Sequence, residues 1–196
     1  TLTQVTDNAE PCLDPFGGDN GSALFFSVRE NKRYYNIYKK DNPFSAAMSQ
    51  KTSGKNYNRN PCYNPETGKI AFSCMQDGSS TSDIFTMFDS KGKALSQITE
   101  STDAYEEHPS FNKLGTLIVY NKIQLSFYRK ANWATFFFGF GGSTVVVENS
   151  EIWLRNVKTG ENVLLGNGYQ PCFSPDGKKI AYVKYSSDAK STSIWI

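Results

Sequence analysis

Short runs of alternating apolar and polar residues recur along the chain, and a tight turn precedes most of them. The clearest copy is 170–183, in which Ser-Pro-Asp-Gly at 174–177 separates 170–173 from the alternating stretch 179–183. Pro, Asp and Gly are residues that tight turns favour, and period-two alternation is typical of a half-buried β-strand. The pattern therefore predicts two strands joined by a tight turn.

Three more stretches align with this copy, so the chain consists of repeats. They lie at 60–73, 108–120 and 10–27, and the last is the most divergent because its turn is longer. The repeat prolines are Pro11, Pro61, Pro109 and Pro171, which are 50, 48 and 62 residues apart. Further strands follow at 36–39, 83–87, 151–155 and 193–196, and closing strands are clearest at 96–99 and 162–165.

A period of about 40 to 50 residues with four short strands is typical of the blades of a β-propeller. We therefore predict an all-β fold, a β-propeller of four-stranded antiparallel blades with four repeats visible, that occupies 1–196 as one domain. A domain of this length buries roughly 70% of the surface of its unfolded chain, which is enough for a sizeable core.

The two ends of the sequence predict how the ring closes. The last repeat stops after its third strand at Ile196, while Thr-Gln-Val-Thr at 3–6 matches the outer strand Ser-Gln-Ile-Thr at 96–99. Because an open ring leaves a seam at which blades can part, we expect 3–6 to close the last blade. Three arrangements stay open: a complete four-bladed ring, a ring completed by an insertion or another chain, and part of a larger propeller.

The motif in 171–182 has a resemblance to a known family. Its order is Pro-x-aromatic-Ser-Pro-Asp-Gly-Lys-Lys-Ile-Ala-Tyr, and Ile-Trp follows at 194–195. It resembles the WD-like repeat of TolB-type propellers and is similar to repeats in the propeller domains of prolyl-oligopeptidase-like and tricorn-like peptidases. The resemblance covers nearly the whole chain and implies the propeller fold, but one fold hosts many functions.

Composition excludes several classes of function. The 21 basic and 19 acidic residues are spread along the chain and give a net charge of +2, which argues against a nucleic-acid-binding surface. No apolar run reaches the 18 or more residues of a membrane helix, and no signal peptide is present. A single histidine and no Cys-x-x-Cys pair argue against a metal site, and we expect no cofactor.

Three of the four cysteines share one position of the repeat. Cys12, Cys62 and Cys172 directly follow repeat prolines, and Ser110 takes this position in the remaining copy. Equivalent positions of different blades should be too far apart for a disulfide, whose Cα atoms are about 4.4 to 6.8 Å apart. We therefore interpret them as small buried residues between blades.

The residues just before each repeat proline form the first candidate site. The resemblance implies that they lie at one face of the ring, close to the mouth of the central channel. This channel-mouth set is Glu10, Asn60, Glu107, His108, Tyr169 and Gln170. Glu107 and His108 have a plainer interpretation as solvated residues of the rim.

An aromatic-rich insertion in the third blade forms the second candidate site. It spans 123–150, where other blades have a loop of about ten residues or fewer. We predict a projecting β-hairpin from strands at 124–129 and 144–148. It packs on its own propeller, binds a partner or second subunit, or contacts a membrane surface. Its aromatic residues are Phe127, Tyr128, Trp133, Phe136, Phe137, Phe138 and Phe140.

Catalysis finds little support in the sequence, so we do not expect an enzyme. There is no Gly-x-Ser-x-Gly nucleophile motif, and an enzyme would need a buried carboxylate with a raised pKa in the channel, for which Glu107 is the candidate.

We hypothesise instead a non-catalytic protein-interaction module, or scaffold, of the bacterial cell envelope. It would be periplasmic or peripherally associated with the outer membrane, and its partner would be another envelope protein or a subunit of a larger complex. The alternatives are an accessory propeller domain of a larger envelope assembly or secretion protein, and a glycan- or small-ligand-binding propeller.

Overall fold

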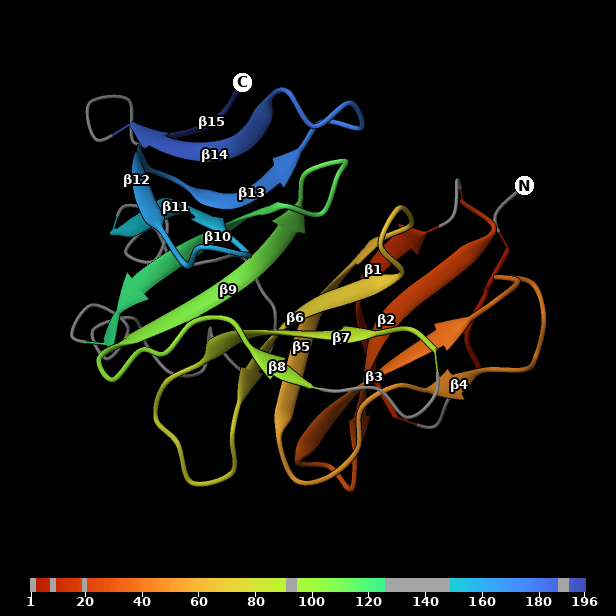
Figure 1. Ribbon diagram of the computed structural model, residues 1–196. Coiled ribbons are helices and arrows are strands. Elements are labelled where there is room, and N and C mark those ends of the chain that lie inside the picture. Colours follow the sequence, from red (N-terminus) through yellow and green to blue (C-terminus); the bar gives the residue numbers. More distant parts are fainter. Residues whose placement is uncertain (1–2, 8–9, 19–20, 91–94, 126–148, 187–190) are drawn as a thin grey trace.

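The computed structural model describes residues 3–7, 10–18, 21–90, 95–125, 149–186 and 191–196. Its strands form four consecutive units (Figure 1). Unit 1 is β1 (Cys12–Gly18), β2 (Ala23–Glu30), β3 (Tyr34–Lys40) and β4 (Ser49–Gln50), and unit 2 is β5 (Tyr57–Asn64), β6 (Lys69–Met75), β7 (Asp83–Phe88) and β8 (Ser96–Gln97). Unit 3 is β9 (Ala104–Phe111), β10 (Leu117–Gln124), β11 (Ser150–Asn156) and β12 (Asn162–Asn167), and unit 4 is β13 (Tyr169–Phe173), β14 (Ile180–Ser186) and β15 (Ser191–Trp195).

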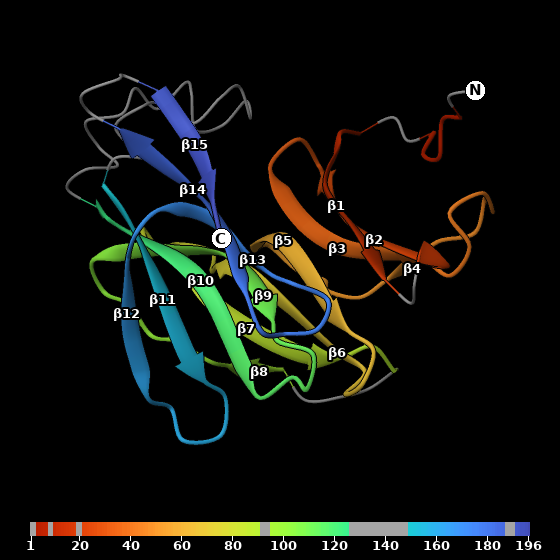
Figure 2. The same cartoon turned by 90° about the horizontal axis from the view of Figure 1, so that it is seen from above.

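Every pairing inside a unit is antiparallel, as predicted. Parallel contacts occur only between units in the described part: Tyr35 pairs with Tyr57, and Ser82 pairs with Tyr105. The units follow one another in an arc, and their first strands β1, β5, β9 and β13 pack side by side on its inner side (Figure 2). The all-β fold is therefore confirmed.

The core lies between successive units, because each middle sheet has a neighbour on both faces. Consecutive residues of β6 show this: Ile70 and Phe72 pack toward unit 1, whereas Ala71 packs toward unit 3. All three are at most 1% exposed. Alternation along the strand thus supplies two interfaces, which is why both faces of this strand are apolar.

Each inner strand contains a bulge whose residue has a left-handed backbone and directly precedes a proline. The φ angles are 53° at Asp14, 52° at Asn60, 53° at His108 and 51° at Gln170. The register of each pair shifts at the same place, so one extra residue stands on each inner strand. Proline fits the next position because it has no N–H group that would lose its partner.

This register corrects the first repeat. Phe16 pairs with Phe25 as Cys62 pairs with Ala71, so the repeat proline of unit 1 is Pro15 and not Pro11. The prediction was wrong because Pro-Cys at 11–12 repeats the letters of 61–62 and 171–172, whereas hydrogen bonding follows the bulge. Cys12 therefore does not share the position of Cys62.

All four cysteines are free thiols. Cys62 is buried as predicted, but Cys172 is exposed and Cys12 is half-buried. The burial interpretation thus holds for one of the three cysteines that it addressed. Cys172 is exposed because it lies in the last unit, whose outer face has no covering sheet among the described residues.

The predicted closure of the last blade by 3–6 is also wrong for this structure. Residues 3–7 form no strand, and β15 pairs with β14 alone in the described part of the chain. The Val5 carbonyl instead accepts a hydrogen bond from Lys40 Nζ at the end of β3. The physical reason is the open arc, which separates the N-terminal segment at unit 1 from unit 4 (Figure 1).

The interfaces between units make a direct stability prediction. Ile84→Ala removes a side chain that is 0% exposed between units 2 and 3, so we expect a loss of about 2 to 5 kcal/mol in the free energy of unfolding. Leu114→Ala is the control, because Leu114 is 66% exposed and its loss should change stability by less than about 0.5 kcal/mol. Urea unfolding measures both, and equal effects would contradict the assigned core.

Candidate functional site

The inner strands of all four units bring polar side chains to one place. We call this group the axial cluster, and it consists of Asp14, Arg59, Asn60, Glu107, His108, Tyr169 and Gln170. Four of its members are the left-handed residues of the bulges. Asn, Asp and His are the non-glycine residues that tolerate this backbone best, so local conformation and side-chain chemistry agree at three of the four positions.

An ion pair between units 1 and 2 anchors the cluster. Arg59 Nε lies 2.6 Å from Asp14 Oδ2, and Arg59 Nη2 lies 3.0 Å from Asp14 Oδ1. The backbone N–H of Asn60 and the Ser27 hydroxyl also donate to Asp14 Oδ2, at 3.2 and 3.0 Å. Burial alone would raise the pKa of Asp14, but Arg59 and these donors hold it below its ordinary value. The pair is therefore charged and satisfied within the protein.

Glu107 lies in the same position of β9 as Arg59 in β5, because Glu107 pairs with Asn121 as Arg59 pairs with Ser73. Burial raises the pKa of Glu107 to about 7, although the Arg59 charge lowers it, and the Asp14 charge raises it further. Glu107 is thus partly protonated at neutral pH. A carboxyl group in this state both donates and accepts hydrogen bonds.

His108 is neutral at neutral pH. Burial lowers the pKa of its imidazole to about 4. The ring lies edge-on to Tyr169 with 5.0 Å between centroids, and His108 Nε2 lies 3.4 Å from Gln170 Nε2. Solvent still reaches part of His108, because its side chain is half-buried.

Unit 4 joins the cluster through its inner strand. The Gln170 backbone N–H donates to Asn121 Oδ1 at 3.4 Å, and the Phe173 N–H donates to the Ser110 hydroxyl at 3.0 Å. Burial and the Glu107 charge raise the pKa of Tyr169, so its hydroxyl stays protonated. The cluster therefore offers uncharged amide, imidazole and phenol groups and the partly protonated Glu107 carboxyl around the Arg59–Asp14 ion pair.

The structure brings together five of the six residues of the predicted channel-mouth set. Glu10 stands apart, because it precedes β1 and its Oε2 lies 3.2 Å from Arg29 Nε of β2. Asp14 takes the corresponding position. Sequence reasoning missed Asp14 and Arg59, although the polar-Pro pair at 14–15 was a readable signal for the former.

The aromatic residues predicted to form a hairpin, Phe127, Tyr128, Trp133, Phe136, Phe137, Phe138 and Phe140, lie outside the described residues. The strands on either side of them, β10 and β11, are paired up to Ile123 and Ser150. Their role stays a prediction.

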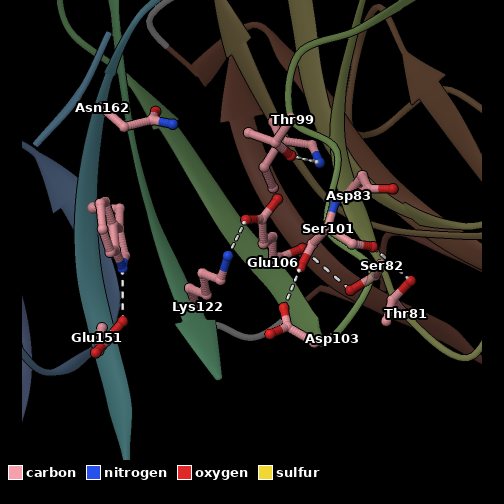
Figure 3. Close-up of polar contacts among 12 residues, drawn as sticks. Thr81, Ser82, Asp83, Thr99, Ser101, Asp103, Glu106, Lys122, Glu151 and Asn162 are labelled. Carbon is pink, nitrogen blue, oxygen red and sulfur yellow. Dashed lines mark hydrogen bonds and ion pairs between the residues drawn. The ribbon is translucent and has the colours of Figure 1, made fainter. Parts of the chain in front are cut away.

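A second polar network joins units 2 and 3 (Figure 3). The Ser101 N–H donates to Asp83 Oδ1 at 2.7 Å, the Ser82 hydroxyl donates to the Glu106 carbonyl at 3.2 Å, and Lys122 Nζ lies 3.4 Å from Glu106 Oε1. Burial raises the pKa of Asp83 to about 6. These bonds hold the crossing from unit 2 to β9, so we interpret the network as structural.

Two further classes of site find no support in the described ranges. No group of three or more His, Cys, Asp or Glu side chains there could hold a metal ion. Within the same ranges, no helical segment has the length and apolar character needed to span a bilayer.

Solved structures of other proteins are similar in fold to this chain. No family model and no curated protein matches the chain. TolB from Acinetobacter baumannii is 19% identical with a TM-score of 0.69, over 97% of this chain and 44% of that one. The putative TolB from Agrobacterium tumefaciens is 17% identical with a TM-score of 0.68, over 97% of this chain and 59% of that one.

A puromycin-hydrolyzing peptidase from Mycobacterium tuberculosis is 11% identical with a TM-score of 0.64, over 98% of this chain and 28% of that one. The chain thus spans about half the length of the two TolB structures and less than a third of the length of the peptidase. The predicted likeness to TolB-type and peptidase propellers is confirmed as a likeness of fold.

The raised pKa of Glu107 predicts a specific pH dependence. The folded protein keeps this proton from the ordinary pKa of 4.5 up to about 7, so wild-type stability should fall relative to Glu107→Gln as pH rises through that window. Urea unfolding of both proteins between pH 4.5 and 7.5 measures the difference. Glu66→Gln, in an exposed turn, is the control, and a stability difference that is flat with pH for Glu107→Gln would contradict the burial of this carboxyl.

Proposed function

We propose that the chain is a non-catalytic protein-binding propeller unit of the bacterial cell envelope. Its axial cluster binds an extended segment of another envelope protein. The observation that carries this proposal is the convergence of one left-handed polar residue from each of four units on a single group. A site assembled from four units is rigid, and a rigid site loses little conformational entropy when it binds.

The chemistry of the cluster suits a peptide. The Arg59 charge is already used by Asp14 at 2.6 Å, so it is not free to bind an anion. What remains are the side-chain amides of Asn60 and Gln170, the neutral His108 ring, the Tyr169 phenol and the partly protonated Glu107 carboxyl. Uncharged donors and acceptors beside an aromatic ring match peptide groups and apolar side chains, as in the cores of protein interfaces.

Likeness to the TolB fold supports the envelope location and an accessory role, and both are proposals for this chain. The His108 ring lies within hydrogen-bond distance of the Gln170 side-chain amide rather than of a hydroxyl or a thiol, which favours binding over nucleophilic catalysis. The insertion at 123–150 is a second proposed contact for the partner. It leaves unit 3 where β10 ends.

Affinity capture from a cell-envelope extract tests this proposal with four forms of the protein. The first is the intact chain and the second is Gln170→Gly with His108→Asn, since Gly and Asn both suit the left-handed backbone of these positions. The third replaces 126–148 by a short Gly-Ser linker, which spares the fully buried Ile123. Glu66→Gln is the matched control, because it changes an exposed turn.

We expect the intact and control forms to capture the same partner, the linker form to capture it less strongly, and the axial variant to lose it. Titration of a fluorescent peptide from that partner should then show binding weakened about tenfold or more by the axial variant. Capture that survives the axial changes and disappears only with the linker form would move the site to the insertion and contradict the proposal.

Catalysis is the second candidate, because Glu107 meets the condition stated for an enzyme. Its pKa of about 7 beside the Arg59 charge is suitable for acid–base chemistry. We expect no product from panels of peptides and oligosaccharides incubated with the chain at pH 7. Turnover that Glu107→Gln abolishes, while Glu66→Gln retains it, would overturn the non-catalytic assignment.

A further inference from the structure

Three tyrosines between two arginines run from the surface of units 1 and 2 to the axial cluster, and we call them the tyrosine chain. At its outer end, the guanidinium carbon of Arg33 lies 5.2 Å from the centre of the Tyr34 ring. The Tyr34 and Tyr57 rings meet edge to face with 6.1 Å between centroids. At the inner end, the guanidinium carbon of Arg59 lies 5.0 Å from the centre of the Tyr35 ring, whose centroid is 6.2 Å from that of Tyr57. Surface and cluster are therefore in continuous contact across the boundary of two units.

The turn that carries Arg33 holds a lysine in a strained backbone conformation. Arg33 N donates to the Glu30 carbonyl at 3.0 Å, and the two residues between them, Asn31 and Lys32, have φ angles of 51° and 58°. Two consecutive positive φ angles are typical of the type I′ turn of a hairpin, which prefers Asn-Gly. Lysine is disfavoured at the second position because of its Cβ atom. Such strain concentrates at functional sites, so the exposed Lys32 side chain is a candidate for binding.

Three described loops, 31–33, 53–56 and 76–78, meet at this end of units 1 and 2 (Figure 1). The Tyr35 N–H donates to the Asn56 carbonyl and the Asp77 N–H donates to Asn56 Oδ1, both at 3.1 Å. Asp77 is the one acidic residue of these loops. Their basic side chains are all exposed, and we call them the basic rim: Lys32, Arg33 and Lys55. Three cations against one carboxylate give this end of the two units a positive charge.

We propose that the basic rim binds an acidic stretch of the segment whose neighbouring residues enter the axial cluster. This inference rests on the proposed function and names the chemistry of its partner, a peptide segment with Asp or Glu side chains. Tyr57 and Asn60 are three residues apart on β5, which is about 10 Å at the rise of a strand. An extended segment that follows β5 therefore places a carboxylate at the rim about three residues from the group that it inserts into the cluster.

The contacts of the tyrosine chain favour an acidic peptide over a single-stranded nucleic acid. Arg33 and Tyr57 both pack on Tyr34, which leaves that ring less surface for the base stacking on which such nucleic acids depend. An arginine stacked on a ring keeps its N–H groups in the guanidinium plane, where they donate to a carboxylate. Opposite charge on the two partners also speeds their encounter. The rim thus selects an acidic segment, and the axial cluster binds its uncharged part.

Fluorescence anisotropy of rhodamine-labelled octapeptides, titrated with the full chain, tests this inference. The acidic probe alternates Gly and Glu, and the neutral probe of equal length alternates Gly and Gln. The rim variants are Lys32→Gly and Lys55→Gln. Lys158→Gln is the matched control, because it removes one charge from an exposed turn at the opposite end of the strands. Thermal unfolding of each variant checks that it is folded.

We expect the acidic peptide to bind about tenfold more tightly than the neutral one, and by a smaller factor as salt is added. Each rim variant should weaken binding of the acidic peptide about three- to fivefold, as the loss of one exposed ion pair does, and Lys158→Gln by less than about twofold. Lys32→Gly should also raise the melting temperature, because it completes an Asn-Gly turn. A purely structural role of Lys32 does not combine higher stability with weaker binding.

Three results would overturn the inference: equal binding of the two peptides, rim variants that bind the acidic peptide as Lys158→Gln does, or tighter binding of oligothymidylate that the same substitutions weaken. Capture of the envelope partner separates it from the proposed function. If the rim variants capture the partner as the intact chain does while the axial variant loses it, this inference fails and the proposed function stands. If the axial variant captures it undiminished, the proposed function fails, and this inference fails with it.

Discussion

The left-handed residue before each repeat proline is the constraint on which the site depends. It adds one residue to the inner strand, and the following proline removes the N–H group that this addition would leave unpaired. The inner strand therefore keeps its pairing on both sides of the bulge while its polar residue turns toward the axis. Asn60 and His108 occupy equivalent places for this reason, although their side chains differ in chemistry.

Burial among neighbouring units then sets the chemistry of these residues. Arg59 and Glu107 occupy the same position of adjacent strands, yet Arg59 is paired with Asp14 while the pKa of Glu107 rises to about 7. Arg59 and Glu107 share the same strand register, so local conformation does not explain why one is paired and the other has a raised pKa. The cause is which charged side chains the neighbouring units place beside each of them. Repetition supplies the scaffold, and the departures from repetition set the chemistry of the axial cluster.

Sequence patterns were sufficient for much of this fold, because turn residues and alternation are local signals. The turn and the alternating residues after it were enough to predict strands β6 and β14. Unit 1 was misaligned because Pro-Cys at 11–12 is a better match in letters than Asp14-Pro15, and only pairing in three dimensions separates the two. The predicted closing role of 3–6 failed for a related reason: the match in letters to 96–99 is local, whereas the position of 3–6 beside unit 1 is a tertiary property.

The pKa shifts of the axial cluster were equally beyond the sequence, since they arise from four strands that are far apart along the chain. The inner strands form the candidate binding site.

The central claim is that four inner strands enclose one polar cluster, and the chain has a single histidine with which to test it. Titration of the His108 imidazole by NMR gives one resonance and needs no assignment. Burial in the cluster predicts a pKa of about 4 for the imidazole, because protein replaces much of the water around the ring. A pKa near the ordinary value of 6.5 would show that the ring is solvated and would contradict the account.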